Sequence, residues 1–324
     1  MAESTVLVVG GAGFIGTNLV RYWLDEHPRD RVISLTSPRH RKHAHDSAVN
    51  VECELDNPVR IREVLSEHDV DTVINCGGWS DNARAVRDPL GCFRANVADC
   101  VNVLEACRTS GVRRYHQVSS AEVYGDIDDR ATADVDESAA QRPFTPYSST
   151  KAAADHLALA YGRTYRFDVT ITLSSNNYGP AQLPEKLIPR FVIRALLGQQ
   201  LPIFDSPGSS REWLHVKDHC RAIDHILAHG TPGQRYNVGS GESADAHQIA
   251  DLILDYLGLP TALKTLVPSR PVLLRRTGVD SGKLRTEVGW RPEKHFATAL
   301  KETIEWYVDN RTWWLPHVDL VGAR

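Results

Sequence analysis

The sequence predicts an α/β fold: a Rossmann-type, doubly wound parallel sheet followed by a smaller C-terminal lobe for substrate binding. Strand-like apolar runs alternate with helical patterns through the first half of the 324 residues, and a glycine-rich turn follows the first run. After residue 175 the chain changes to turns rich in Asn, Gly and Pro. This alternation indicates a parallel sheet covered on both faces. We expect a dinucleotide-binding domain over residues 1–175 and a lobe over 176–324, some segments of which return to the first domain.

The elements of the first half follow in order from their apolar patterns. Short, mostly apolar runs predict strands at residues 5–9, 31–36, 50–55, 71–76, 113–119 and 168–174. Helical periodicity predicts helices at residues 14–26, 57–68, 88–110 and 145–165. In the second helix, the apolar residues Val59, Ile61, Val64 and Leu65 are expected on one side, which is the apolar face of a helix packed on a sheet.

Composition narrows the classes of protein to consider. The chain is 42% hydrophobic and 24% charged with a net charge of −4, so neither nucleic acid nor a membrane is expected as a partner. The N-terminal stretch has no basic segment before its first strand, so no secretory signal is expected. Six cysteines without a C-x-x-C pair predict buried free thiols and a reducing, cytoplasmic setting.

The glycine-rich turn GGAGFIG predicts the dinucleotide site. Gly10, Gly13 and Gly16 follow the first strand, and Phe14 and Ile15 open the next helix. One glycine permits the tight turn, another lets a pyrophosphate approach the backbone, and the third lets helix and strand pack closely. The helix N-terminus then attracts the phosphates.

The end of the second strand bears on which nicotinamide cofactor binds. An acid is expected there to hold the adenosine ribose, but the sequence has Thr36, with no carboxylate before Asp46. Basic residues follow instead: Arg39, Arg41 and Lys42. Arginine would attract a 2′-phosphate, so NADP competes with NAD, unless this loop is solvated and does not touch the cofactor. Glu54 and Leu55 are candidates for the adenine end of the site.

Two further segments predict chemistry at a hydroxyl-bearing carbon. Tyr147 and Lys151 are one helical turn apart, so phenol and ammonium lie on one face. A free tyrosine has a pKa near ~10, but a nearby Lys⁺ and an oxidised nicotinamide favour the phenolate. The phenolate can take a hydroxyl proton as hydride leaves the same carbon. At the end of the fifth strand, VSSAE supplies Ser120 to orient the reacting oxygen and places Glu122 beside it.

With these motifs the chain resembles the extended short-chain dehydrogenases/reductases that act on nucleotide sugars, and among them the dTDP-glucose 4,6-dehydratases. GGAGFIG and YSSTKAAADH fit the broad superfamily, whereas EVYGD, SNNYGPAQLPEKLIPRFV, REWLHVKDHCRA, YNVGSG and WYVDNRTWW are far more specific. The resemblance implies a nucleotide diphosphate sugar as partner, a tightly bound and recycled NAD or NADP, and no metal. It also implies a homodimer formed through the helices at 88–110 and 145–165.

The resemblance implies a mechanism as well. Tyr147 and Lys151 oxidise the sugar at C4, and the new ketone acidifies the C5 proton, which Glu122 removes. An acid that precedes the glutamate protonates the departing C6 hydroxyl. Hydride then returns from the cofactor to C6 and gives a 4-keto-6-deoxy sugar.

This sequence departs from the family at that acid, because Ser-Thr-Asp-Glu reads SSAE at residues 119–122, with Ala121 in place of Asp. General acid catalysis is typically worth about 10²–10⁴-fold, so elimination needs a substitute. Asp81, His215, or Glu122 acting twice through an ordered water could serve. The alternatives are an epimerase at C4 or C5, a uronic acid decarboxylase, or an inactive cofactor-binding protein, against which the intact tyrosine, lysine and glutamate argue.

The residues expected around the substrate also come from the resemblance. They are Ser80, Asn177, Lys186, Leu187, Arg211 and Arg276. Arginine suits a diphosphate because its planar fork binds phosphate oxygens at two points. Three departures predict an altered sugar or nucleotide preference: Trp79 after the fourth strand, residues 272–274 in place of Gly-His-Asp, and Thr277 at a tyrosine position. Trp79 either narrows the sugar pocket or is ordinary packing.

Overall fold

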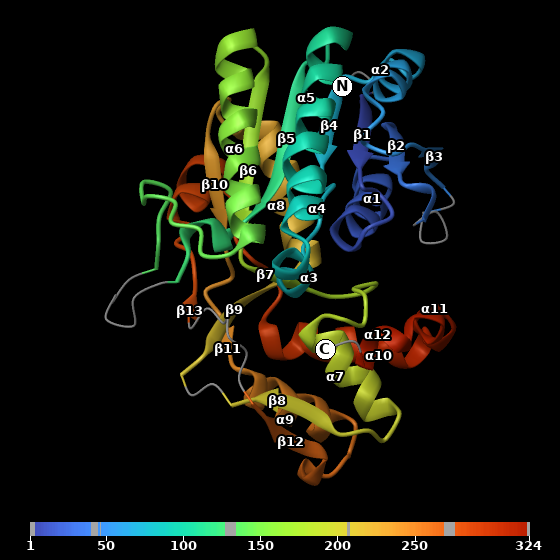
Figure 1. Cartoon of the computed structure of the whole chain (residues 1–324), viewed down its shortest axis with the longest axis vertical. Helices are drawn as coiled ribbons and strands as arrows, with labels where there is room; N and C mark the ends of the chain where they lie inside the picture. The colour runs from blue at the N-terminus through green and yellow to red at the C-terminus, as the bar shows by residue number, and fades with distance from the viewer. Residues whose placement is uncertain are drawn as a thin grey trace.

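The structure is a computed structural model that describes residues 4–39, 45, 47–126, 134–205, 208–268 and 276–322. Its main body is a seven-stranded parallel sheet in the order β10-β6-β5-β4-β1-β2-β3 (Figure 1). The strands are β1 (Thr5–Val9), β2 (Arg31–Thr36), β3 (Val49–Glu52), β4 (Thr72–Asn75), β5 (Arg114–Ser120), β6 (Asp168–Ser174) and β10 (Arg235–Val238). From β1 the chain winds outward in both directions, which confirms the predicted doubly wound α/β fold.

Alternate residues of β1 show how both faces of the sheet are covered. The covering helices are α1 (Phe14–Glu26), α2 (Pro58–Glu67), α5 (Asp99–Ser110), α6 (Pro146–Tyr165) and α8 (Val216–His229). Leu7 and Val9 lie in the core formed with α2, α5 and α6. Val6 and Val8 lie in the opposite core, formed with α1 and α8. Successive side chains of a strand point to opposite faces, so a strand buried on both sides is apolar throughout.

Segments from the second half of the chain complete this sheet. β10 pairs with β6 at one edge, and α8 covers the face opposite α6. The chain therefore leaves the sheet after β6, builds part of the lobe, and returns through α8 and β10.

The long helix predicted at residues 88–110 is not a single α-helix. It consists of α4 (Pro89–Phe93), a π-helical segment η2 (Arg94–Ala98) and α5. In η2 the buried Asn96 reaches the loop after β4, where its Oδ1 accepts from the Trp79 N–H at 2.7 Å. Its Nδ2 donates to Thr150 Oγ1 on α6 at 2.9 Å. Single π-helical turns occur often at functional sites.

The second lobe lies below the carboxyl ends of the sheet strands in Figure 1. Its strands are β7 (Asn176–Tyr178), β8 (Leu201–Phe204), β9 (Ser210–His215), β11 (Ser243–Ala244), β12 (Lys264–Val267) and β13 (Arg276–Thr277). Its helices are α7 (Leu187–Leu196), α9 (Ala246–Tyr256), α10 (Phe296–Asp309), α11 (Arg311–Trp314) and α12 (Asp319–Gly322). β9 pairs with β7, β11 and β13, whereas β8 and β12 form a separate pair. The helices enclose an apolar core that includes Phe191, Ile253 and Trp314.

Short helical elements complete the described structure. They are α3 (Asn82–Arg87), η3 (Ala121–Tyr124), η4 (Thr261–Leu263), η5 (Leu284–Val288) and η6 (Leu315–His317). Within the described ranges, the helices are all too short or too polar to cross a membrane. The same ranges contain no group of His, Cys, Asp and Glu side chains arranged to hold a metal ion.

The close approach of α1 to β1 generates a first prediction. A Cβ at Gly16 would lie 2.1 Å from the Gly10 carbonyl oxygen, so Gly16→Ala must push the helix away from the strand. Overpacking of this kind costs about 1–3 kcal/mol, and we expect that loss in the free energy of unfolding, measured by urea titration. Gly322→Ala is the control, because no atom that the structure describes comes within 4 Å of its added Cβ. If both variants lost the same amount of unfolding free energy, the close contact between Gly16 and the Gly10 carbonyl would not be the cause.

Candidate active site

The turn between β1 and α1 is shaped to receive a phosphate group. Gly10 has φ = +73°, and its N–H and that of Gly11 both donate to one carbonyl at the end of β2, at 2.8 and 3.2 Å. α1 begins after Gly13, and no described side chain caps it there. The N–H groups of its first turn, which includes Phe14 and Ile15, therefore remain available to an anion.

At the end of β2 the fold supplies a carboxylate that the local sequence lacks. Thr36 is buried, and the next residue, Ser37, donates from Oγ to Glu54 Oε1 at 2.8 Å. Leu55 follows Glu54, and its side chain lies beside Gly77 in the loop after β4. The Arg39 side chain is exposed. The other residues considered for this loop, Arg41, Lys42 and Asp46, lie outside the described residues.

The four residues expected to act on the sugar meet at the carboxyl end of β5. Tyr147 and Lys151 lie one turn apart on α6 and are only 8% and 7% exposed. Lys151 Nζ donates to the Val118 carbonyl at 2.6 Å. Burial raises the pKa of Tyr147, the charge of Glu122 raises it further, and a hydrogen bond with Ser120 lowers it. The phenol of the protein alone is therefore protonated at neutral pH, and added positive charge nearby is needed to make it a base.

Glu122 interacts with polar groups from both lobes, Asn82 beside the sheet and Arg211 in the second lobe. It is half-buried in η3, where its N–H donates to Ser120 Oγ at 3.2 Å and its Oε2 accepts from Asn82 Nδ2 at 2.8 Å. Arg211 of β9 faces it from the second lobe: burial lowers the pKa of Arg211, and the charges of Glu122 and Asp126 oppose that shift. A carboxylate from the sheet and a guanidinium from the lobe therefore share one site.

The groups considered as substitutes for the missing acid have other roles. Ala121 is 6% exposed and lies in the apolar core. Asp81 caps α3, where its Oδ1 accepts from the N–H groups of Ala83 and Arg84 at 2.8 and 3.2 Å. Burial lowers the pKa of His215 to about 4, so its ring is uncharged at neutral pH. A carboxyl engaged as a helix cap and a neutral imidazole are both poor candidates for a proton donor.

The residues expected around the substrate occupy different positions. Lys186 Nζ donates to the Ser80 carbonyl at 2.6 Å and so links the start of α7, at Leu187, to the loop after β4. Asn177 turns inward, and its side chain bonds three neighbouring groups of the protein at 2.9–3.0 Å. The loop after β4 and the start of α7 are thus brought together, whereas the Asn177 amide is used within the protein.

Arg276 and Thr277 form β13, which pairs with β9 so that Arg276 lies opposite Ser210 and Thr277 opposite Arg211. This register places the backbone of Arg276 near Arg211. The structure does not describe the side chains of Arg276 and Thr277, and residues 272–274 lie outside the described residues.

Trp79 packs beside the active-site tyrosine. Its ring contacts a small apolar cluster of Ala85, Cys92 and Tyr147, and the Arg84 guanidinium lies over it, 3.4 Å from the ring centroid. Ordinary packing therefore holds the ring against the cluster that includes Tyr147, and a narrowing of the sugar pocket by Trp79 stays a prediction.

The sequence reasoning missed residues that shape the site, among them Gly11, Asn96 and Asn82. Gly11 is required because a Cβ there would lie 2.3 Å from Ser34 Oγ, and its place directly after a strand is a usable signal. Asn96 and Asn82 gave no signal, since each acts through a contact with a distant loop. Such contacts become visible only once the sheet is assembled.

A buried acid extends the line of Tyr147 and Lys151 along α6. Asp155 lies one turn beyond Lys151, is 1% exposed, and accepts from Ser119 Oγ at 2.6 Å. Burial raises the pKa of Asp155 to about 7, although Lys151, Ser119 and Arg235 each lower it. Its helical spacing from the tyrosine was a signal that the sequence offered.

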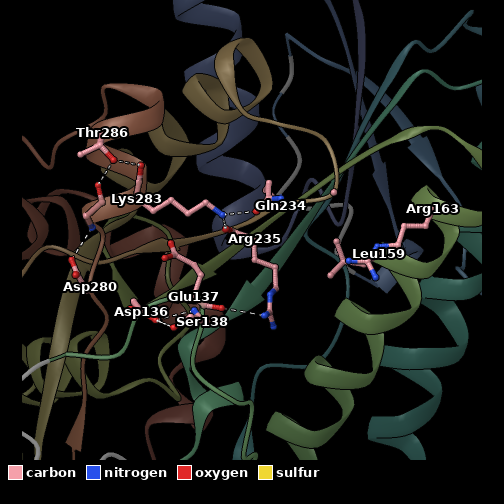
Figure 2. Close-up of a pocket in the computed structure, with 12 residues that line it drawn as sticks. Asp136, Glu137, Ser138, Leu159, Arg163, Gln234, Arg235, Asp280, Lys283 and Thr286 are labelled. Carbon is pink, nitrogen blue, oxygen red and sulfur yellow. Dashed lines mark hydrogen bonds between the residues drawn. The ribbon is translucent and has the colours of Figure 1, made fainter.

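A separate hollow of about 670 Å³ lies at the β10 edge of the sheet (Figure 2). Its walls carry both charges, among them Glu137, Arg235 and Lys283. These groups already bond one another or the backbone: Lys283 Nζ donates to Gln234 Oε1 at 2.7 Å, and Arg235 donates to the Glu137 carbonyl at 3.2 Å. Arg235, which acts on Asp155, lines it, but Tyr147, Lys151, Ser120 and Glu122 do not, so the hollow is distinct from the candidate active site.

The carboxyl of Asp155 predicts a pH dependence of stability. Because its pKa is raised to about 7 in the folded protein, its stabilising contribution is full below about pH 4 and is lost as the pH rises through 7. We expect the stability of Asp155→Asn, relative to the unaltered protein, to increase between these pH values in urea titrations. Asp168→Asn, at an exposed position, controls for the chemical change alone. A relative stability of Asp155→Asn that does not change with pH would contradict the prediction.

Comparison with known proteins agrees with this geometry. Residues 6–239 match the model of the NAD dependent epimerase/dehydratase family. The dTDP-glucose 4,6-dehydratase of Streptomyces niveus is 36% identical over 321 residues, covering 96% of this chain and 95% of that one. The Escherichia coli dTDP-glucose 4,6-dehydratase is 31% identical over 345 residues and covers 95% of each chain.

Solved structures give the same result. The dTDP-glucose 4,6-dehydratase of Streptomyces venezuelae, with NAD bound, superposes with a TM-score of 0.91 at 36% identity and covers 96% of this chain and 99% of that one. The UDP-glucose 4-epimerase of Thermus thermophilus, in complex with NAD, has a TM-score of 0.87 at 26% identity and covers 94% and 99%. The chain therefore belongs to the NAD-dependent epimerase/dehydratase family of nucleotide-sugar enzymes.

Proposed function

We propose that this chain is a nucleotide-sugar 4,6-dehydratase that uses tightly bound, recycled NAD to form a 4-keto-6-deoxy sugar. One observation carries the proposal: Tyr147, suited to oxidation at C4, lies within electrostatic range of Glu122, suited to deprotonation at C5. Two successive steps on neighbouring carbons need two such groups in one site. The full-length similarity to dTDP-glucose 4,6-dehydratases supports the same reaction.

The residues at the end of β1 fit a dinucleotide. A Cβ at Gly10 would lie 3.1 Å from a backbone nitrogen, and one at Gly16 would clash outright, so glycines allow the tight turn and the close approach of helix to strand that place the N-terminus of α1 where a pyrophosphate would bind. When bound there, NAD supplies the acceptor that takes hydride from C4 and returns it to C6. Glu54, held by Ser37 at the ribose end, would repel a 2′-phosphate and so favours NAD over NADP.

The chain's own residues then move the protons. Tyr147 takes the proton of the C4 hydroxyl, with Ser120 orienting the oxygen and Lys151 supplying positive charge. Glu122 takes the C5 proton that the C4 ketone has made acidic. The same carboxyl then gives this proton to the C6 hydroxyl, which leaves as water, so the elimination needs no second acid. When hydride returns to C6, C5 takes a replacement proton from solvent through Glu122. The other duties of Asp81 and His215 support this assignment.

We place the diphosphate of the substrate between β9 and the start of α7. Arg211 would bind it with a planar fork, and Lys186, Ser80 and Leu187 would border it from the opposite side. Arg276 begins the strand next to Arg211 and would add a second charge. Asn177 would support the site through its bonds within the protein.

Ala121 favours a second candidate function, epimerisation at C5. Without a dedicated acid, a carbanion formed at C5 can be reprotonated instead of losing the neighbouring hydroxyl. The same tyrosine, lysine and glutamate would serve both reactions. Mass spectrometry of the product separates them, because dehydration removes one water, epimerisation leaves the mass unchanged, and a uronic acid substrate would lose carbon dioxide.

We also propose a homodimer in which a second copy packs on α4, α5 and α6. Leu90 and Phe93 of the α4 region are 67% and 50% exposed, and Val86 and Phe144 are exposed nearby. α4 and α5 both pack beside α6 on the outside of the sheet (Figure 1). Apolar side chains gathered on adjacent helices are typical of a surface that another protein covers.

The two-step mechanism predicts that C4 oxidation and C5 deprotonation can be separated. With dTDP-glucose as substrate, Glu122→Gln should still produce the absorbance of reduced nicotinamide. Solvent deuterium should enter C5 about 10²–10⁴-fold more slowly, because the base is gone. Tyr147→Phe is the counterpart and should abolish the absorbance itself. If Glu122→Gln exchanges C5 at the unaltered rate, Glu122 is not the base.

The position of Glu54 predicts the cofactor. Extraction of the purified protein should release NAD, and Glu54→Gln should raise the affinity for NADP relative to NAD, because it removes a charge that repels the 2′-phosphate. Titration by fluorescence quenching measures both affinities. Glu63→Gln, on the surface of α2, is the control for the loss of a carboxylate elsewhere. Release of NADP alone would overturn the assignment.

A further inference from the structure

Asn82 makes two side-chain hydrogen bonds in the candidate active site, one to Glu122 and one to Thr145. Its Nδ2 donates to Glu122 Oε2 at 2.8 Å, and its Oδ1 accepts from Thr145 Oγ1 at 2.7 Å. Thr145 caps α6, the helix that carries the tyrosine and lysine. A single amide at the start of α3 therefore connects the loop after β4, the carboxylate after β5 and the N-terminus of α6.

The neighbouring bonds fix which end of this amide faces the carboxylate. Ser148 Oγ donates to the Thr145 carbonyl, which leaves the Thr145 hydroxyl proton for Asn82 Oδ1. The reverse orientation would place the amide oxygen against a carboxylate oxygen, and two acceptors cannot bond each other. The Asn82 nitrogen therefore points at Glu122.

We propose that Asn82 is a positioning residue that gives the two oxygens of Glu122 different roles, an inference that rests on the proposed function. Asn82 holds Oε2 with an N–H, so Oε2 is the anchored oxygen. Oε1 then takes the proton from C5 and returns it to the leaving hydroxyl. If one carboxyl acts twice, it must stay in one orientation between the two steps, and a neutral donor on Oε2 provides this.

The charged groups that face Glu122 do not duplicate this role. Arg211, from β9, and Tyr147, from α6, both interact with it electrostatically. A charge acts over distance and from many directions, whereas an amide N–H bond is directional. Asn82 is also uncharged, so it fixes the carboxylate without adding a second cation, which would lower its basicity.

Two substitutions at this position test the inference in the full-length protein with its bound cofactor, with dTDP-glucose as the probe. Asn82→Leu removes both hydrogen bonds. We expect deuterium exchange at C5 to fall about 10–100-fold, while the absorbance of reduced nicotinamide forms within about twofold of the unaltered rate. Asn310→Leu, which removes a half-buried amide far from the site, controls for the cost of the change to the fold.

Asn82→Asp gives a readout that a purely structural role would not change. It keeps an acceptor for Thr145 but puts a like charge beside Glu122, which raises the pKa of the base. We expect C5 exchange to be slow at pH 7 and to recover as the pH rises. Arg211 and Tyr147 face Glu122 equally in both proteins, so they do not account for the difference.

The outcomes separate the inference from the function on which it depends. If oxidation and C5 exchange fall equally in Asn82→Leu, or if C5 exchange is unchanged and Asn82→Asp shows no shift with pH, Asn82 does not position Glu122. If the unaltered protein forms no reduced nicotinamide with dTDP-glucose or UDP-glucose, the proposed function fails and the inference fails with it.

Discussion

A buried ammonium ties the helix that carries the phenol to the strand that leads to the carboxylate. Lys151 Nζ donates to the Val118 carbonyl at 2.6 Å, and Ser119 donates to Asp155 one turn further along α6. Two contacts one turn apart fix both the rotation and the height of the helix on β5. Because a buried charge is costly unless it is bonded, this arrangement resists change. Tyr147 is thereby held beside the residues that follow β5.

The parallel sheet determines what else can reach that phenol. The carboxyl ends of β1, β4 and β5 lie at one edge, so the glycine turn, the loop that follows Asn75, and Glu122 converge there. The second lobe completes the site from below with Arg211 and with Lys186, which bonds to the loop after β4. In the proposed reaction each lobe would supply what the other lacks: the sheet would provide the groups that move protons, and the lobe would provide cations for a phosphate-bearing substrate.

Local patterns in the sequence predict the parts that depend on near neighbours. The strands, the glycine turn and the pairing of Tyr147 with Lys151 follow from short-range spacing. Contacts between distant residues do not: the sequence at the end of β2 indicates NADP as readily as NAD, although Glu54 supplies a carboxylate there from 17 positions away. Asn82 and Glu122 are 40 positions apart, and they come together only because they follow the neighbouring strands β4 and β5. The π-helical segment η2 is hidden for another reason, since it keeps the apolar periodicity of a helix.

Ala121 belongs to the apolar core beside the site and is not simply an aspartate that has lost its carboxyl group. Ala121 is buried among apolar side chains that include Val123 and Ala152. A carboxylate there would lose the hydration that a charge requires and would need a hydrogen-bond partner in its place. The site is organised around one carboxylate instead, with an amide on one oxygen and a phenol and a guanidinium nearby. The proposed transfer of one proton from C5 to the hydroxyl on the adjacent C6 suits such a site, whereas chemistry that needs two carboxyls in opposite protonation states does not.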